Sequence, residues 1–355
     1  MLTRLHNLRS QFEPLGIDAF LVTFQPHLRY LTGFSGSSGV GFVTRRSTYL
    51  ITDGRYAEQA RDQVPGWKTF IAHDSLFEEI RSQNLLRYGW RIGFDGNTLT
   101  YAQFKYLKKI FPKVKFLPKV ETIEKIAAVK DAGEIERIRQ AVRITDQVFT
   151  EILPLIKPGV TELDIAAEIS YRQRKHGAEA DAFEAIVASG ERSSLPHGRA
   201  TAKKLATGEL VTLDFGCIFE GYHSDMTRTL ALGKPKADAK TIYGVVLDAQ
   251  RKAIEAARSG MKTKDLDAIA RGVIKQHGFD KFYRHSLGHG IGLQIHEPPR
   301  ISVLSTSILG SGNVVTIEPG IYIPHLGGVR IEDDIVITNG NCEVLNRSSK
   351  ELIVL

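Results

Sequence analysis

Cysteine is scarce in this chain, which has only Cys217 and Cys342 among its 355 residues. A secreted scaffold held by disulfides needs more cysteines, so that class is excluded, and a reducing cytoplasm is the simplest compartment. No apolar run approaches the ~20 residues that cross a bilayer. The N-terminal segment, residues 1–16, is amphipathic and lacks the continuous apolar centre of a secretory signal. We therefore expect a cytoplasmic protein with no membrane partner.

Signals for phosphate or nucleic-acid binding are also missing. The glycine- and serine-rich segment YLTGFSGSSGVGF, residues 30–42, lacks the Gly-Lys-Ser/Thr order of a phosphate-binding loop. Part of the formal charge of +7 comes from residues 104–130, which contain eight lysines and two acids. These lysines alternate with apolar residues, as they do on the hydrated face of a helix and a strand. A nucleic-acid surface would interleave them with exposed aromatics or arginines, so we expect no such partner.

What the chain does contain is ordinary globular composition, with 42% hydrophobic and 25% charged residues. Domains usually have about 100–200 residues, so two are expected. In residues 1–125, strand-like segments at 18–23, 40–44, 48–52 and 91–96 alternate with helical patterns at 56–63 and 101–111. Strands that alternate with helices predict an α/β domain with a mixed or parallel sheet.

A second domain, residues 126–355, is predicted to begin with a long amphipathic helix at 131–156, where apolar residues recur near a period of 3.6. It contains a candidate internal repeat. Residues 158–177 and 259–278 each have a turn, a polar start of a helix, an amphipathic helix and a terminal glycine. A helix followed by strands, repeated once, predicts an α+β domain with a pseudo-twofold axis. Its cleft should lie between the two halves.

Four acids occupy strand-like, apolar contexts in this second domain. Asp214 and Asp225 lie on two predicted strands that are joined by a turn at EGY, so pairing would bring them close together. Glu318 ends the β-branched run NVVTIE, and Glu332 follows Arg330 in GGVRIEDD. Acids are seldom fully buried unless they are paired or bound to a metal. One such acid favours a surface position, but four together favour a site.

The segment LGHGIGLQIHEPP, residues 287–299, adds His289 and His296. By itself it is compatible with metal binding, proton transfer or a simple turn. With the four acids, His289 gives an oxygen-rich ligand set without thiolate, which argues against structural zinc. It suits manganese or cobalt, with zinc possible. Four carboxylates need two divalent ions for neutrality, so we expect two metals ~3.5–4 Å apart that share a bridging water or hydroxide.

At this point the chain resembles a known family. The motifs TLDFG, HSDMTRT, SLGHGIGLQIHEPP, TIEPGIY and GGVRIEDD, in this order, resemble the pita-bread metallopeptidases. Within them they resemble the proline-specific branch, aminopeptidase P and prolidase, from about residue 157 to the C-terminus. Residues 1–125 resemble the creatinase/prolidase N-terminal domain, most closely at YLTGFSGSSG and TDGRYAEQA. Creatinase itself shares the fold but lacks the metal ligands, so it is disfavoured.

The resemblance implies a role for each of the five ligands. Asp214 would bind the first metal, and Asp225 and Glu332 would bridge both. His289 and Glu318 would bind the second metal. Glu318 would also accept a proton from the bridging water.

The resemblance also implies catalytic roles for four further residues. His197 matches a histidine that contacts the substrate near the scissile bond, and His296 matches one that faces the substrate carbonyl and the proline. His285 fits the proline-specific branch and not the methionine aminopeptidases. Arg330 matches an arginine near the metals that helps to orient the substrate. Tyr222 and Tyr322 have weaker claims, and packing is the favoured interpretation for both.

The function implied is metal-dependent hydrolysis of the Xaa-Pro bond, in dipeptides or at the N-terminus of short peptides, by a homodimer. Two alternatives stay open from the sequence. One is an enzyme like methionine aminopeptidase, and the other is a non-catalytic pita-bread module that binds protein or nucleic acid.

Overall fold

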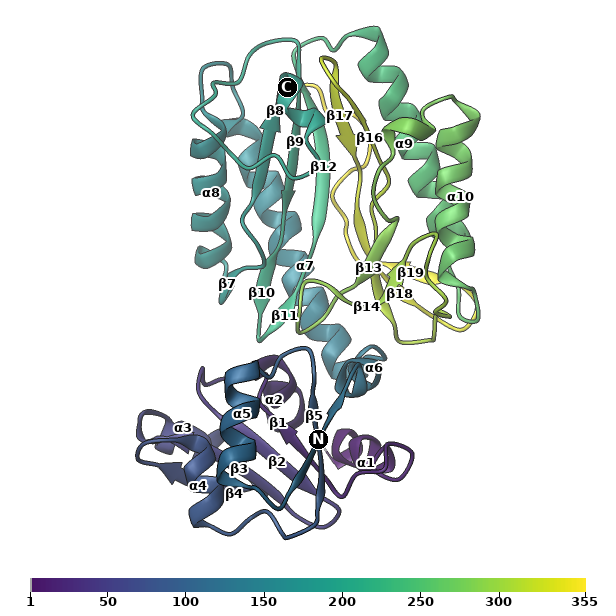
Figure 1. Cartoon of the computed structure of the whole chain (residues 1–355). Coiled ribbons are helices and arrows are strands. Elements are labelled where there is room, and N and C mark those ends of the chain that lie inside the picture. Colours follow the sequence, from purple (N-terminus) through teal and green to yellow (C-terminus); the bar gives the residue numbers. More distant parts are fainter. Residues whose placement is uncertain (1) are drawn as a thin grey trace. The chain divides into compact units, whose positions relative to one another are not determined.

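The computed structural model describes residues 2–355. They form two compact units, one that ends at Ala127 and one that runs from Ala128 to Leu355. Figure 1 shows the first unit in purple and blue and the second in teal, green and yellow. None of the helices in residues 2–355 combines the length and the apolar content that a bilayer span requires.

The first unit is built on one mixed, six-stranded sheet in the order β4-β3-β2-β1-β5-β6. Its strands are β1 (Ala19–Val22), β2 (Val40–Thr44), β3 (Thr48–Asp53), β4 (Lys68–Ala72), β5 (Arg91–Asp95) and β6 (Lys115–Lys119). Its α-helices are α1 (Leu2–Ser10), α2 (Gln25–Thr32), α3 (Ala57–Gln63), α4 (Leu76–Ser82), α5 (Tyr101–Ile110) and α6 (Thr122–Ala127). β2 pairs antiparallel with β1 and β3, whereas β1–β5, β5–β6 and β3–β4 pair in parallel. The predicted α/β class with a mixed sheet is confirmed.

The two strands that the sequence did not predict, β4 and β6, are the edges of this sheet. β6 reads KFLPK and carries a proline and two lysines, which are tolerated where one side of a strand is unpaired. The lysine-rich segment follows its predicted pattern over α5 and β6, where Lys105, Lys108 and Lys115 are exposed. Lys130 departs from it, because it is buried in an ion pair with Glu297, with 2.9 Å between Nζ and Oε2.

The second unit contains four α-helices, α7 (Ala132–Ile152), α8 (Glu162–Lys175), α9 (Ala237–Ala256) and α10 (Thr263–Gln276). Its first half holds β7 (Ala180–Asp181), β8 (Ile186–Ser189), β9 (Glu209–Phe215), β10 (Cys217–Phe219), β11 (Tyr222–His223) and β12 (Met226–Leu232). Its second half holds β13 (Gly288–Gly290), β14 (Glu297–Ile301), β15 (Val314–Ile317), β16 (Gly320–Ile323), β17 (Gly327–Arg330), β18 (Asp333–Ile337) and β19 (Cys342–Val344). The sheets have the orders β12-β9-β8, β11-β10-β7, β14-β13-β15-β18-β19 and β16-β17.

The predicted internal repeat is present in the backbone. Gly159 and Gly260 both have positive φ, of 92° and 86°, and each donates its N–H to the carbonyl of a leucine, Leu205 or Leu309. Each leucine in turn donates its N–H back to the residue after that glycine, Val160 or Met261. In the first half, α8 follows the glycine and β9 follows the leucine. In the second half, α10 and β15 occupy the same places. The α+β pseudo-twofold architecture is therefore confirmed.

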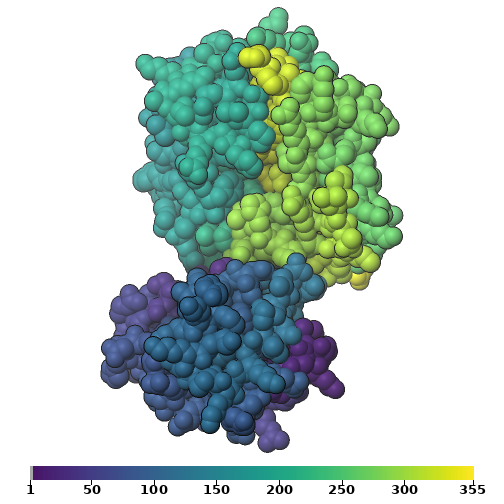
Figure 2. Space-filling view, viewed as in Figure 1, coloured from purple at the N-terminus to yellow at the C-terminus, as the bar shows by residue number. Residues whose placement is uncertain are grey.

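The two halves lie side by side in the second unit, with α7 and α8 flanking one half and α9 and α10 the other (Figure 1). On the surface, the teal and green halves enclose yellow residues from the C-terminal segment (Figure 2). Each half has its own apolar core. One core gathers residues of α7, α8, β9 and β12, and the other gathers residues of α9, α10, β15 and β18. The candidate site lies on β9 and β13 and at the ends of β12, β15 and β18.

Candidate metal centre

Asp214 and Asp225 are placed by one hairpin of the first half. β9 and β12 pair antiparallel, with Asp214 opposite Thr227, and Asp225 lies just before β12. The hairpin turns at Glu220 and Gly221, which have φ of 46° and 83° as a two-residue hairpin turn of type I′ requires. The predicted EGY turn is confirmed, and both aspartates are buried.

Glu318 and Glu332 occupy the corresponding place in the second half. β15 and β18 pair antiparallel up to the pair Ile317–Asp333, and the two glutamates are the next residue on each strand. Glu332 also connects the halves. Its N–H donates to the Thr227 carbonyl at 3.1 Å, and its Oε2 accepts from Thr227 Oγ1 at 2.6 Å. Each half therefore supplies two acids from the ends of paired strands.

His289 reaches the acids from β13, where glycines flank it on both sides. A Cβ on Gly288 would lie 1.9 Å from the Thr316 carbonyl oxygen, and one on Gly290 would lie 2.3 Å from that of Pro298. Only glycine permits so close an approach of β13 to its neighbours. The strand holds His289 Nε2 at 3.7 Å from Asp225 Oδ2 and 3.6 Å from Glu318 Oε1.

The protonation of His289 follows from its contacts. Burial and the neighbouring His296 lower the pKa of His289 to about 4, so the ring is neutral near pH 7. Its Nδ1 lies 3.1 Å from the Gly290 carbonyl oxygen and carries the proton. Nε2 therefore turns a lone pair toward two carboxylates that also offer lone pairs.

The acids repel one another strongly in the absence of a cation. Burial, followed by the charges of Glu332 and Asp214, raises the pKa of Asp225 well above its usual range. Burial and Glu332 do the same for Glu318. Burial and Asp214 raise the pKa of Glu332 to about 8. Among the described residues, Asp214 Oδ1 and Asp225 Oδ1 are buried here without a hydrogen-bond donor.

These observations test whether the donor set fits divalent cations. One oxygen or nitrogen from each of Asp225, His289 and Glu332 lies within 4.8 Å of the others. All offer lone pairs, and Arg330 is the basic group among the charges that act on Glu318 and Glu332. Its Nη2 is 2.5 Å from Asp214 Oδ2. Asp214, Asp225 and Glu332 are buried, and the Glu318 side chain is 18% exposed. One guanidinium cannot neutralise these four carboxylates, so the residues fit bound divalent metal ions.

The metal-free protein should lose stability between pH 6.5 and pH 8. A carboxyl whose pKa is higher in the folded than in the unfolded protein stabilises the fold at a pH below its ordinary pKa, near 4.5. This stabilisation is lost as the pH rises through the pKa of the folded protein, which is about 8 for Glu332. His289 and His285, whose pKa values are lowered, act below pH 6.5 instead. We expect the Tm after chelation and dialysis to be lower at pH 8 than at pH 6.5. A Tm that rises over this interval would contradict the mutual repulsion.

His296 and His197 lie beside these five residues on exposed positions. The His296 ring centroid is 4.3 Å from that of His289, with the planes at 78°. Burial and then the charge of His197 lower the pKa of His296. The carbonyl of Pro196, next to His197, accepts from Arg330 Nη1 at 3.2 Å. His296 therefore contacts His289, and His197 lies close enough to His296 for its charge to act there.

His285 and Arg330 are joined by the hydroxyl of Tyr322. Arg330 Nη1 donates to Tyr322 Oη at 2.6 Å, and Tyr322 Oη lies 3.0 Å from His285 Nε2. His285 Nδ1 faces the Ser286 carbonyl oxygen at 2.8 Å and carries the proton, so Tyr322 donates to Nε2. Burial, together with Arg330, lowers the pKa of His285 to about 3. His285 is therefore a neutral acceptor at the end of a fixed chain.

Two comparisons with known proteins bear on this arrangement. Residues 136–339 match the model of Metallopeptidase family M24, and residues 4–129 match that of the Creatinase/Prolidase N-terminal domain. The chain belongs to metallopeptidase family M24. A family M24 protein is a hydrolase that depends on divalent metal ions, in agreement with the donor set.

Relatives within the family share the whole length of the chain. The Xaa-Pro dipeptidase of Pyrococcus furiosus is 38% identical, over 99% of this chain and 100% of its own length. The solved structure of an Xaa-Pro dipeptidase from Bacillus anthracis is 40% identical with a TM-score of 0.96, covering 100% of this chain and 99% of that one. An X-Pro aminopeptidase from Thermotoga maritima is 35% identical with a TM-score of 0.90, covering 98% and 100%.

The sequence missed several residues that position this family M24 centre. Asp334 Oδ2 accepts from the Asp225 N–H at 2.9 Å, and Thr227 holds Glu332. Tyr322 was expected only to pack, but its hydroxyl joins Arg330 to His285. Tyr222, by contrast, is buried with its hydroxyl donating to Glu134 Oε1 of α7 at 3.0 Å. The signal for Asp334 was present, since it is another acid in the apolar strand β18.

Replacing Tyr322 with Phe should lower kcat/KM for a peptide substrate by about 10- to 100-fold. The change removes the hydrogen bond that Tyr322 accepts from the Arg330 guanidinium and the one that it donates to His285. The bond to the charged group alone is worth about 1.5–3 kcal/mol, and Arg330 Nη1 keeps the Pro196 carbonyl. Tyr243→Phe is the matched control, because Tyr243 is also buried and donates to the Lys350 carbonyl at 2.8 Å, away from the site. Equal losses in the two variants would show that the network only stabilises the fold.

Proposed function

We propose that this family M24 metallopeptidase hydrolyses the bond between any residue and proline, in dipeptides or at the N-terminus of short peptides. The observation that supports this most strongly is the convergence of Asp214, Asp225, His289, Glu318 and Glu332 in a chain that matches Xaa-Pro peptidases over its whole length. A methionine aminopeptidase-like function is less well supported, because the first unit matches the Creatinase/Prolidase N-terminal domain. A non-catalytic module would not need to keep the complete donor set.

We assign the five residues as the metal ligands. When bound, divalent ions supply a Lewis acid for the carbonyl and lower the pKa of the attacking water. Mn²⁺ is our first choice, with Co²⁺ and Zn²⁺ as alternatives, because the ligands are four carboxylates and one imidazole. Asp225 from the first half and Glu332 from the second half would hold the ions together with His289, Asp214 and Glu318.

Different side chains carry out the two proton transfers of the reaction. Glu318 accepts a proton from the attacking water, because burial among acids makes its carboxylate basic. The peptide nitrogen of proline has no hydrogen and must gain one as it leaves. His296 or His197, both exposed, supplies that proton. Arg330, fixed by Tyr322 and Asp214, orients the substrate.

The test is a comparison of Ala-Pro with Ala-Pro-Ala as substrates of the Mn²⁺-loaded enzyme, with metal content verified. Release of alanine from either peptide supports the proposal, and the ratio of the two rates distinguishes dipeptidase from aminopeptidase action. A Met-Ala-Ser peptide is the control for the rival specificity. Cleavage of neither proline peptide by the loaded protein would refute the proposal.

We further propose that the enzyme is a cytoplasmic homodimer, with residues 1–125 as a creatinase/prolidase-type N-terminal domain and residues 126–355 as the pita-bread catalytic domain. The low cysteine content, with Cys217 and Cys342 both unpaired, supports a reducing compartment. Light scattering after size-exclusion chromatography tests the dimer directly. A mass of a single 39.4 kDa chain at assay concentration would contradict it.

A further inference from the structure

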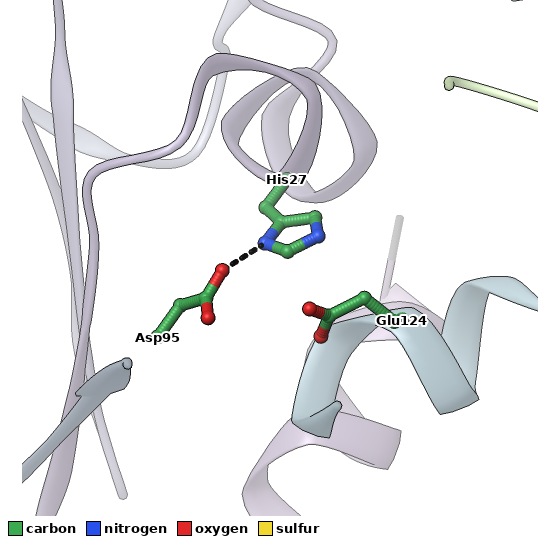
Figure 3. A group of neighbouring side chains, drawn as sticks. All are labelled: His27, Asp95 and Glu124. Atoms are coloured by element: carbon green, nitrogen blue, oxygen red, sulfur yellow. Dashed lines mark ion pairs between the residues drawn. The ribbon is translucent and has the colours of Figure 1, made fainter. Parts of the chain in front are cut away.

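A second group of potential ligands lies entirely within the first unit. His27 comes from α2, Asp95 ends β5, and Glu124 lies on α6, and the three side chains point toward one another (Figure 3). One ligand atom from each lies within 4.8 Å of the others. His27 and Asp95 are each only 4% exposed, and Glu124 is half-buried. The three elements are far apart in the sequence, so the fold assembles the group.

The spacing within this group is that of two ligands of one ion. His27 Nδ1 lies 3.7 Å from Asp95 Oδ2, which is too long for a hydrogen bond. The separation equals the 3.7 Å between His289 Nε2 and Asp225 Oδ2 in the metal centre. Two ligands bound tetrahedrally at about 2.0–2.2 Å from one ion are themselves about 3.3–3.6 Å apart. The pair needs only a slight contraction to bind a cation between them.

The two carboxylates of this group lie close enough to act on each other electrostatically. Asp95 is fixed as an acceptor, because Oδ1 accepts from the Asn97 N–H at 2.9 Å and Oδ2 from Thr98 Oγ1 at 3.0 Å. Burial raises the pKa of Glu124, and the charges of Asp95 and Glu121 raise it further. The nearest lysine in sequence, Lys125, is paired with Glu121 at 3.3 Å instead. A divalent cation between Asp95 and Glu124 would relieve this repulsion.

We propose that His27 Nδ1, Asp95 and Glu124 bind a further divalent cation of the first transition series, such as Zn²⁺, separate from the metal centre. One imidazole and two carboxylates are typical ligands for such an ion. Water completes the coordination on the half-exposed side of Glu124. The ion would join α2, β5 and α6 and would stabilise the first unit in the way that structural metals do.

The experiment measures bound metal, so it does not depend on the peptidase function. Asp225→Asn/Glu332→Gln is the background, because it removes two ligands of the metal centre. Both proteins, the background and the background with His27→Asn added, are incubated with excess Zn²⁺ and passed through gel filtration. Mass spectrometry of the intact folded chain should then show one more zinc ion per chain in the background. Glu124→Gln should have the same effect. His73→Asn is the matched control, since His73 is an exposed histidine of the same unit.

Two results would overturn the proposal. One is an equal zinc content with and without His27→Asn in a background that remains folded by circular dichroism. The other is an equal loss in the His73→Asn control. Should His27→Asn fail to fold, Glu124→Gln decides alone, because Glu124 is half-exposed and its amide analogue keeps its shape. Independent support would come from Co²⁺, whose visible absorption should change with His27→Asn and not with His73→Asn.

Discussion

Glu318→Gln is expected to lower kcat for Ala-Pro by about 100- to 10,000-fold while the fold is retained. The amide keeps the size of the side chain but cannot accept the proton of the attacking water, and it is a poorer metal ligand. The same change should raise the Tm of the metal-free protein, because it removes one of the mutually repelling buried carboxylates. Steady-state kinetics and thermal unfolding after chelation measure the two effects.

The opposite signs of these effects separate a catalytic role from a structural one. Glu343→Gln is the matched control, because Glu343 lies on β19 of the same unit in an ion pair with Arg139 on the surface. It should leave kcat unchanged. A Glu318→Gln enzyme within tenfold of the parent kcat, at verified metal content, would remove Glu318 from the mechanism.

Arg228→Met should produce the largest loss of stability. Arg228 is 2% exposed and donates from Nη2 to Asp333 Oδ1 at 2.7 Å. Its Nη1 also donates to the carbonyl of Glu332 at 2.5 Å, so it fixes the strand that carries a proposed metal ligand. Removing one partner of a buried ion pair leaves an uncompensated charge, at a cost of about 3–5 kcal/mol. We expect a drop of several degrees in Tm and weaker metal binding.

The comparison for this prediction is Arg251→Met. Arg251 pairs with Glu351 on the surface, where both side chains are about half-exposed or more, and such pairs contribute little. Its Tm should not change measurably. Lys350 keeps a contact with Asp333 at 2.8 Å in the Arg228 variant, so Asp333→Asn in addition should restore part of the loss. If Arg228→Met melts like the parent, the buried pair does not stabilise the second unit.

Local patterns predicted much of the first unit. The alternation of apolar residues located β2 at its observed ends and β3 and β5 to within one residue. It failed for β4 and β6, because edge strands with lysine and proline do not show the apolar alternation of a buried strand. In the second unit, the helix predicted at 131–156 is observed as α7, and its start is fixed by a capping box of Asp131 and Glu134 that the sequence analysis did not use.

The candidate site was predictable for a different reason. Asp214, Asp225, Glu318 and Glu332 stand out because each interrupts an apolar strand, and burial of acids requires compensation. Thr227 and Tyr322 did not stand out, because a threonine in a strand and a tyrosine in an apolar segment are what packing alone would place there. Their roles depend on which atoms meet across the halves, and one strand does not specify that.

From the sequence alone followed the inner strands of the first unit, the repeat of the second unit and the acids that a buried strand cannot keep uncompensated. These features follow from interactions between residues near one another in the chain, or from the cost of burying a charge anywhere. Tertiary structure alone decided that Arg330, Tyr322 and His285 form one hydrogen-bonded chain, and that His27, Asp95 and Glu124 meet. Such contacts join residues many positions apart, and their geometry is fixed only when the sheets and helices pack.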